Sequence, residues 1–107
     1  MPSKLTFALS LCRKAGALVT GFDAVKDSAL HGKAVLVLCA GDASDGTRRR
    51  VDDFCEDLVD VLHVPETQFE LSQVCKKPTA VFAVTDANLA ALCRKSAAAT
   101  PIKEETT

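Results

Sequence analysis

The sequence predicts an α/β fold in which a sheet is covered by helices on both faces. Residues 34–40 form an unbroken apolar run bounded by charge and Gly, and residues 80–85 form another. Runs of this length are too short for buried helices and are typical of strands covered on both sides. Segments with helical spacing of apolar residues alternate with the strands, which favours a layered arrangement. With 107 residues, 48% of them hydrophobic, the chain has the size of one domain with its own core.

The first two helices are predicted from apolar spacing and from glycines placed to end them. Ser3 can cap a helix that ends at Gly16, and a second helix over residues 22–31 ends at Gly32. A short strand over residues 17–20 separates them. The residues expected to face the core are Leu5, Ala8, Leu9, Cys12, Val25 and Ala29.

The other three helices begin at side chains that can cap them. Ser44 precedes a third helix, Thr67 and Glu70 have the spacing of a capping box that opens a fourth, and Asp86 begins a fifth. A short strand over residues 60–64 lies between the third and fourth helices. The expected inner face of the third helix comprises Val51, Phe54, Cys55 and Leu58.

The domain is expected to span residues 1–95, followed by a flexible tail over residues 96–107, where Ala, Thr and Glu occur without periodicity. The apolar stretch over residues 5–11 is too short for a signal peptide and runs into basic residues. No apolar run approaches the roughly 18 residues that cross a bilayer. We therefore expect a cytoplasmic protein with no membrane partner.

The five cysteines predict neither a metal site nor a cofactor. They are widely spread, without a C-x-x-C pair or a His at ligand spacing. Most are expected to be small buried hydrophobes in a reducing compartment, with Cys75 as the exception because it falls in a predicted loop. The set comprises Cys12, Cys39, Cys55, Cys75 and Cys93.

The sequence offers no catalytic residue. Neither His31 nor His63 has an evident partner for acid–base work, and His31 precedes a helix-ending glycine, where it can interact with the helix dipole. An enzyme that uses Cys75 as its nucleophile would lack a neighbouring base. We therefore expect a protein that is not an enzyme.

The net charge of the chain argues against nucleic-acid binding, whereas the clustering of its basic residues favours it. The net charge of −1 argues against phosphate binding, which usually requires a basic domain. The basic residues are nevertheless clustered, at positions 13–14, 48–50, 76–77 and 94–95. With no Tyr or Trp and five Phe, stacking of bases on an aromatic platform is not expected, so RNA would be recognised by shape, loops and backbone.

Three stretches are candidates for ligand binding, and each has a structural alternative. Residues 21–26 open a helix after a strand, so their N–H groups can bind phosphate, or they form a plain turn in which Phe22 packs on the core. Residues 48–50 can bind phosphate, or they can form i,i+4 ion pairs along one helix, Arg48 with Asp52 and Arg49 with Asp53. The loop at residues 76–79 has few neighbouring acids and is freer to bind phosphate.

Four stretches together resemble one superfamily. They are L-C-R-K-A-G-A-L-V-T-G (11–21), H-G-K-A-V-L-V-L-C-A-G-D-A-S (31–44), E-L-S-Q-V-C-K-K-P-T (70–79) and A-V-F-A-V-T-D (80–86). In order and spacing they resemble the kink-turn-binding ribosomal proteins of the L-seven-Ae and L-thirty-e type, most closely the small bacterial YlxQ-like branch. The resemblance implies a three-layer α-β-α sandwich with a four-stranded mixed sheet and binding to an RNA internal loop of kink-turn form.

The resemblance also implies where RNA would bind, although several contact side chains differ. The family's G-x-N-E-x-x-K turn keeps its Gly as Gly21, whereas Asp23, Ala24 and Asp27 replace the Asn, Glu and Lys. Lys26 is adjacent to the last position, although one residue rotates a side chain by about 100° around a helix. The RNA-binding residues expected here are Lys14, Thr20, Gly21, Phe22, Asp23, Lys26, Lys33, Gly41, Asp42, Lys76, Lys77, Pro78 and Thr79.

Two functions therefore remain open at the level of sequence. The first is a monomeric accessory protein that binds structured RNA, either ribosomal RNA or another kink-turn-like RNA, in association with the ribosome. The second is a protein-interaction module of the same fold that has lost RNA binding, which the sequence pI of 6.1 and the acidic residues between positions 52 and 60 favour.

Overall fold

The computed structural model describes residues 4–56, 58–75 and 78–98. Helices and strands alternate along these residues as the sequence predicts. Their order and bounds are α1 (Lys4–Lys14), β1 (Leu18–Thr20), α2 (Phe22–Leu30), β2 (Leu36–Cys39), α3 (Asp45–Cys55), β3 (Val61–His63), α4 (Gln68–Cys75), β4 (Val81–Val84) and α5 (Ala87–Ala98).

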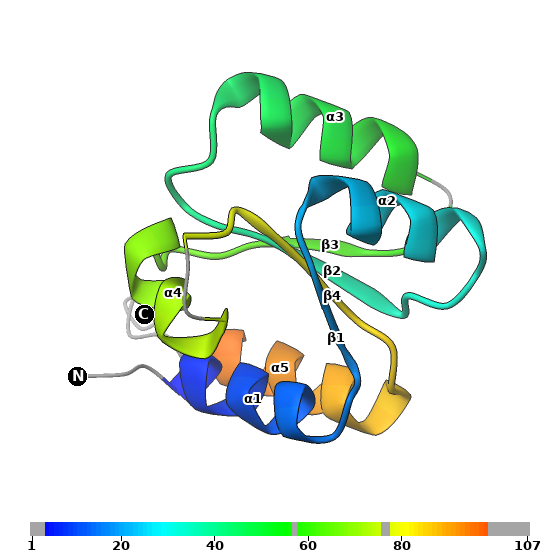
Figure 1. Cartoon of the computed structure of the whole chain (residues 1–107). Coiled ribbons are helices and arrows are strands. Elements are labelled where there is room, and N and C mark those ends of the chain that lie inside the picture. Colours follow the sequence, from blue (N-terminus) through cyan, green and yellow to red (C-terminus); the bar gives the residue numbers. More distant parts are fainter. Residues whose placement is uncertain (1–3, 57, 76–77, 99–107) are drawn as a thin grey trace.

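The sheet is mixed and has the strand order β1-β4-β2-β3. Strand β4 is antiparallel to both β1 and β2, whereas β2 and β3 are parallel. Helices α2 and α3 cover one face, and α1, α4 and α5 cover the other (Figure 1). The predicted three-layer α-β-α sandwich with a four-stranded mixed sheet is confirmed.

Both central strands are buried along their whole length, and alternate residues serve opposite layers. Phe82 and Val84 of β4 join Leu36 and Leu38 of β2 in the core beneath α1, α4 and α5. The residues between them join the core beneath α2 and α3. Because side chains alternate across a strand, an unbroken apolar run is what two buried faces require.

Side-chain caps begin the last three helices where the sequence places them. Ser44 Oγ accepts a hydrogen bond of 3.1 Å from the Thr47 N–H at the start of α3. Thr67 and Glu70 bond reciprocally, since the Thr67 N–H donates to Glu70 Oε1 at 2.8 Å and the Glu70 N–H donates to Thr67 Oγ1 at 3.2 Å. Asp86 Oδ1 accepts from two backbone N–H groups of α5. The capping box is therefore confirmed.

Three local expectations were wrong. Leu58 is 55% exposed instead of lying on the inner face of α3, because that helix ends at Cys55 and the chain turns before Leu58. Cys75 is the last residue of α4 and does not lie in a loop. Helix α5 continues through Ala98, so residues 96–98 belong to the folded domain; the rest of the predicted tail lies outside the described residues.

The buried cysteines include one close pair. Cys12 of α1 and Cys93 of α5 are both fully buried, with their Sγ atoms 3.7 Å apart, at hydrogen-bonding distance for thiols. Burial raises the pKa of the Cys93 thiol to about 12 and also raises that of Cys12. Because the thiolate is the nucleophilic form, both groups are expected to be unreactive in the folded protein. Cys39 and Cys55 are buried as well.

None of the described helices is long and apolar enough to cross a membrane.

Thiol labelling tests this account of the core. At pH 8 we expect Cys12 and Cys93 to react with iodoacetamide at least about tenfold more slowly in the native protein than in guanidinium, because burial disfavours the thiolate. Site-resolved mass spectrometry measures both rates, and the unfolded chain is the control. Equal rates in the two conditions would contradict the burial described for α1 and α5.

Candidate nucleic-acid interface

The last residues of β1, β2 and β3 and the first residues of β4 lie at the same end of the sheet. Thr20 at the end of β1 pairs with Phe82, and Cys39 at the end of β2 pairs with both Val81 and His63. The turns after β1, β2 and β3 and the turn before β4 therefore lie together. We call this region the loop edge and define it as residues 20–23, 41–42, 64–67 and 78–80.

Backbone hydrogen bonds hold these turns against one another. The Gly21 N–H donates to the Val81 carbonyl at 3.0 Å, and the Ala40 N–H donates to the Ala80 carbonyl at 2.8 Å. The Gly41 N–H donates to the Glu66 carbonyl at 2.8 Å. Three of the sequence-predicted stretches, around Gly21, Gly41 and Thr79, are thus brought to one place.

Gly21 leaves the start of α2 open. Its φ of 94° and ψ of 146° belong to a region that essentially only glycine adopts. Gly21 is the N-cap residue of α2, and no side-chain hydrogen bond caps this helix end. The first intrahelical bond runs from the Val25 N–H to the Gly21 carbonyl. The N–H groups of residues 22–24 therefore precede the hydrogen-bonded part of the helix, where N–H groups and the helix dipole favour an anion or a carbonyl oxygen.

Aromatic and basic side chains surround this helix start. The Phe22 and Phe54 rings pack edge to face with centroids 5.4 Å apart, so Phe22 does join the α2–α3 layer, as the structural alternative proposed. The Arg50 guanidinium lies 5.8 Å from the centroid of the Phe22 ring. Together with Lys26 and Asp53, these side chains line a hollow of about 340 Å³.

Phe54 was missed as a site residue, and Arg50 belonged to the candidate stretch 48–50 without being among the expected RNA-binding residues. Their spacing of four residues on a predicted helix was a usable signal, because it places both on one face. The spacing alone does not show that this face of α3 lies beside the start of α2.

The Gly41 turn carries a second polar cluster. Arg48 Nη2 donates to the Gly41 carbonyl, so this side chain turns toward the loop edge instead of pairing with Asp52. Asp52 Oδ1 is instead 3.0 Å from His63 Nε2. Among ion pairs between described residues, neither of the two expected i,i+4 pairs of α3 occurs. Two buried atoms here, Arg48 Nε and Glu66 Oε1, have no hydrogen-bond partner within the described chain.

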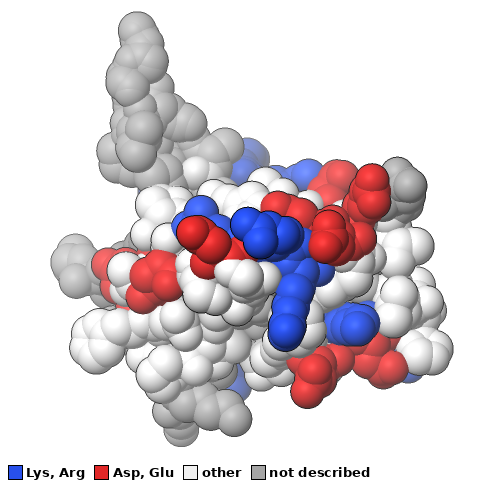
Figure 2. Space-filling view, turned by 90° about the horizontal axis from the view of Figure 1, so that it is seen from above, with Lys and Arg blue, Asp and Glu red and all other residues white. Residues whose placement is uncertain are grey.

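The face formed by α2 and α3 has mixed charge. Figure 2 shows Lys and Arg side chains gathered near its middle with Asp and Glu on either side. Asp42, in the turn after β2, has a structural role, because its Oδ1 accepts from the Gln68 N–H at 2.9 Å at the start of α4. The carboxylate of Asp27 lies 3.2 Å from His31 Nδ1.

Solved structures share this architecture. The chain is similar to a protein of unknown function from Bacillus halodurans, with a TM-score of 0.74 and 29% sequence identity, covering 88% of this chain and 99% of that one. It is also similar to the Giardia lamblia 15.5 kD RNA binding protein, with a TM-score of 0.71 and 23% identity, covering 87% of this chain and 84% of that one. The chain has the fold of these proteins. No protein-family model and no curated protein sequence matches it.

Two of the predicted RNA-binding residues lie away from the loop edge. Lys33 precedes β2, where Val35 bonds to the end of β4, so it is at the opposite end of the sheet. Lys14 ends α1, close to the start of β1 and likewise at that opposite end. The sequence places both lysines near loops, but it does not show at which end of the sheet each lysine lies. Lys76 and Lys77 lie outside the described residues, whereas Pro78 is exposed and Thr79 is buried.

Both histidines have local partners. His31 Nδ1 lies 2.8 Å from the Asp27 carbonyl in the last turn of α2, in agreement with its expected role at the helix end. His63 pairs with Asp52, a partner that the sequence did not reveal. The described part of the chain contains no group of three or more His, Cys, Asp or Glu side chains that could hold a metal ion.

A pair of glycine substitutions tests the packing of the loop edge. A Cβ at Gly41 would lie 2.7 Å from the Pro65 carbonyl oxygen and 2.9 Å from that of Val64. We expect Gly41→Ala to lower the free energy of unfolding by about 2 kcal/mol, because backbone atoms must move. Gly46→Ala is the matched control: a Cβ there meets nothing within 4 Å, so stability should stay the same or rise by up to about 1 kcal/mol. Urea denaturation measures both, and an unchanged Gly41→Ala would contradict the close approach.

Proposed function

We propose that this chain is a non-catalytic protein that binds structured RNA through the loop edge, with a kink-turn-like internal loop as its ligand. The observation that carries the proposal is the open start of α2 at Gly21, held beside the Gly41 and Thr79 turns. This arrangement lies within a fold shared with an RNA binding protein from Giardia lamblia. The proposal includes a monomeric, cytoplasmic protein that acts in association with the ribosome.

Backbone groups supply the recognition in this proposal. The N–H groups of residues 22–24 can donate to phosphate oxygens or to base edges, and Gly21 has no side chain to obstruct an approaching base. Asp23 is exposed and can accept hydrogen bonds from the N–H groups of guanine. A backbone-centred site explains how binding can persist where Asp23 and Ala24 replace the family's Asn and Glu.

The cations nearest to this site are few and well placed. Lys26 and Arg50 line the hollow beside the start of α2, and the cation–π contact with Phe22 orients Arg50. Each can neutralise one phosphate.

A second candidate function is a protein-interaction module. Phe7 of α1 is 65% exposed and Phe69 of α4 is 77% exposed, and large exposed aromatic side chains are typical of protein interfaces. Co-purification with and without nuclease separates the two functions. Partners lost on nuclease treatment support RNA binding, whereas partners that persist support the module.

Affinity measurements test RNA binding at the loop edge. We expect the protein to bind a kink-turn RNA more tightly than a plain duplex, with affinity falling steeply as salt rises. Lys26→Gln should weaken binding about tenfold at low salt, the equivalent of about 1.4 kcal/mol, because it removes one phosphate contact.

Lys95→Gln is the control, since Lys95 is exposed on α5 in the opposite layer. Fluorescence anisotropy at several salt concentrations gives both the affinity and the salt slope. Equal affinity for duplex and kink-turn RNA, or equal effects of the two substitutions, would refute the proposal.

A further inference from the structure

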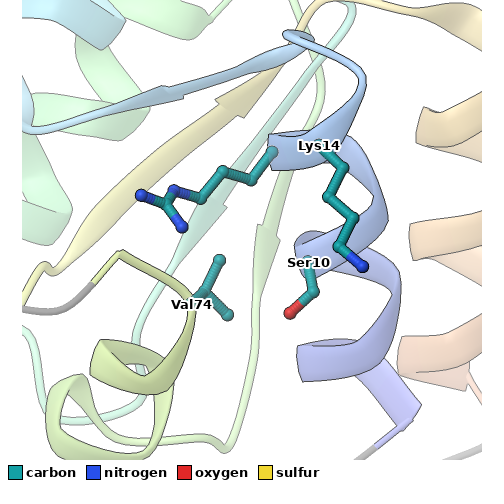
Figure 3. A pocket seen from close by; sticks show the side chains of 4 residues that line it. Ser10, Lys14 and Val74 are labelled. Carbon is teal, nitrogen blue, oxygen red and sulfur yellow. The ribbon is translucent and has the colours of Figure 1, made fainter.

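A second basic hollow lies between α1 and α4, outside the loop edge. The described residues that line it are Ser10, Arg13 and Lys14 of α1 and Val74 of α4, and its volume is about 340 Å³. Figure 3 shows Ser10 and Lys14 on α1 and Val74 projecting from the last turn of α4. The hollow explains where Lys14 points, although its helix turn is at the far end of the sheet.

We infer that this hollow binds a phosphate group of the RNA backbone, an inference that rests on the proposed function. Ser10 lies three residues before Arg13 and four before Lys14, so it neighbours both on the helix surface. Arginine offers a planar fork of N–H donors that fits phosphate oxygens, lysine offers a point charge and serine a hydroxyl donor. Three different donors thus line the same hollow.

The charge of the hollow is not neutralised from within the described chain. None of its four described lining residues is acidic. The ion pairs formed between described residues involve His31, His63 and Arg94, and neither Arg13 nor Lys14 takes part in them. Both side chains are exposed and therefore available to an anion.

Three of the last carbonyl groups of α1 are already paired with backbone N–H groups. The carbonyls of Leu11, Cys12 and Arg13 accept from the N–H groups of Ala15, Ala17 and Gly16. Basic residues in a last helical turn also stabilise the helix dipole, and this role requires only their charge.

The hollow is within reach of RNA bound at the loop edge. Val74 in α4 precedes Pro78 by four residues, which span at most roughly 14 Å of chain. A few nucleotides of RNA backbone cover such a distance.

The test compares two double variants that remove equal charge. R13Q/K14Q empties the hollow of its cations, whereas K4Q/K95Q removes two exposed lysines that are not among its described lining residues. Kink-turn RNA affinity is measured over a range of salt concentrations, and circular dichroism checks that both variants fold. We expect R13Q/K14Q to bind at least about fivefold more weakly at low salt, with a salt slope smaller by about 1, because one phosphate contact is lost.

If R13Q/K14Q binds kink-turn RNA with the same affinity and salt slope as K4Q/K95Q, the inference about the hollow is wrong. The proposal that the loop edge binds RNA would not be affected by this result. If the unaltered protein binds no RNA, the proposed function is wrong. Titration with inorganic phosphate then tests whether the hollow binds phosphate. NMR shifts of the amides of residues 10–14 that saturate in the unaltered protein and vanish in R13Q/K14Q support a phosphate site. The absence of such shifts refutes it, and the same shifts produced only by an acidic peptide assign the hollow to a protein partner.

Discussion

Strand β4 must bury both of its faces while it pairs with β1 on one side and β2 on the other, and the rest of the structure depends on this constraint. Its four residues are all buried, and they divide between the two helical layers. Apolar burial on both sides holds the strand in the middle of the sheet. Antiparallel pairing then places its first residue beside the last residues of its neighbours.

The loop edge is a direct result of that pairing. The carbonyls of Val81 and Ala80, at the start of β4, accept from Gly21 and Ala40. Backbone hydrogen bonds to the start of this buried strand therefore hold the turn into α2 and the turn after β2. The proposed binding surface can therefore keep its geometry when side chains on it change. In the proposed function, recognition relies on backbone N–H groups, with Lys26, Arg50 and the hollow on α1 supplying charge.

Sequence reasoning predicted the architecture well because it rests on local and periodic signals. The two apolar runs, the Ser44 cap and the Thr67–Glu70 capping box each specify their own element, and all were confirmed. Strand order also determines which loops converge, and it brings the stretches around Gly21 and Gly41 together. Residues were misplaced where tertiary packing decides the outcome. Arg48 donates to the Gly41 carbonyl, seven residues away, and Leu58 is exposed because α3 ends before it. Lys33 lies at the end of the sheet opposite the loop edge.

The most direct test of the central claim is the map of backbone amide shifts when kink-turn RNA is added to isotopically labelled protein. The account predicts that the largest changes fall on residues 20–24 and 41–42, with smaller changes on residues 10–14, and that the turn containing Lys33 stays unchanged. Changes confined to the Lys33 end of the sheet, or an unchanged loop edge at saturating RNA, would contradict it.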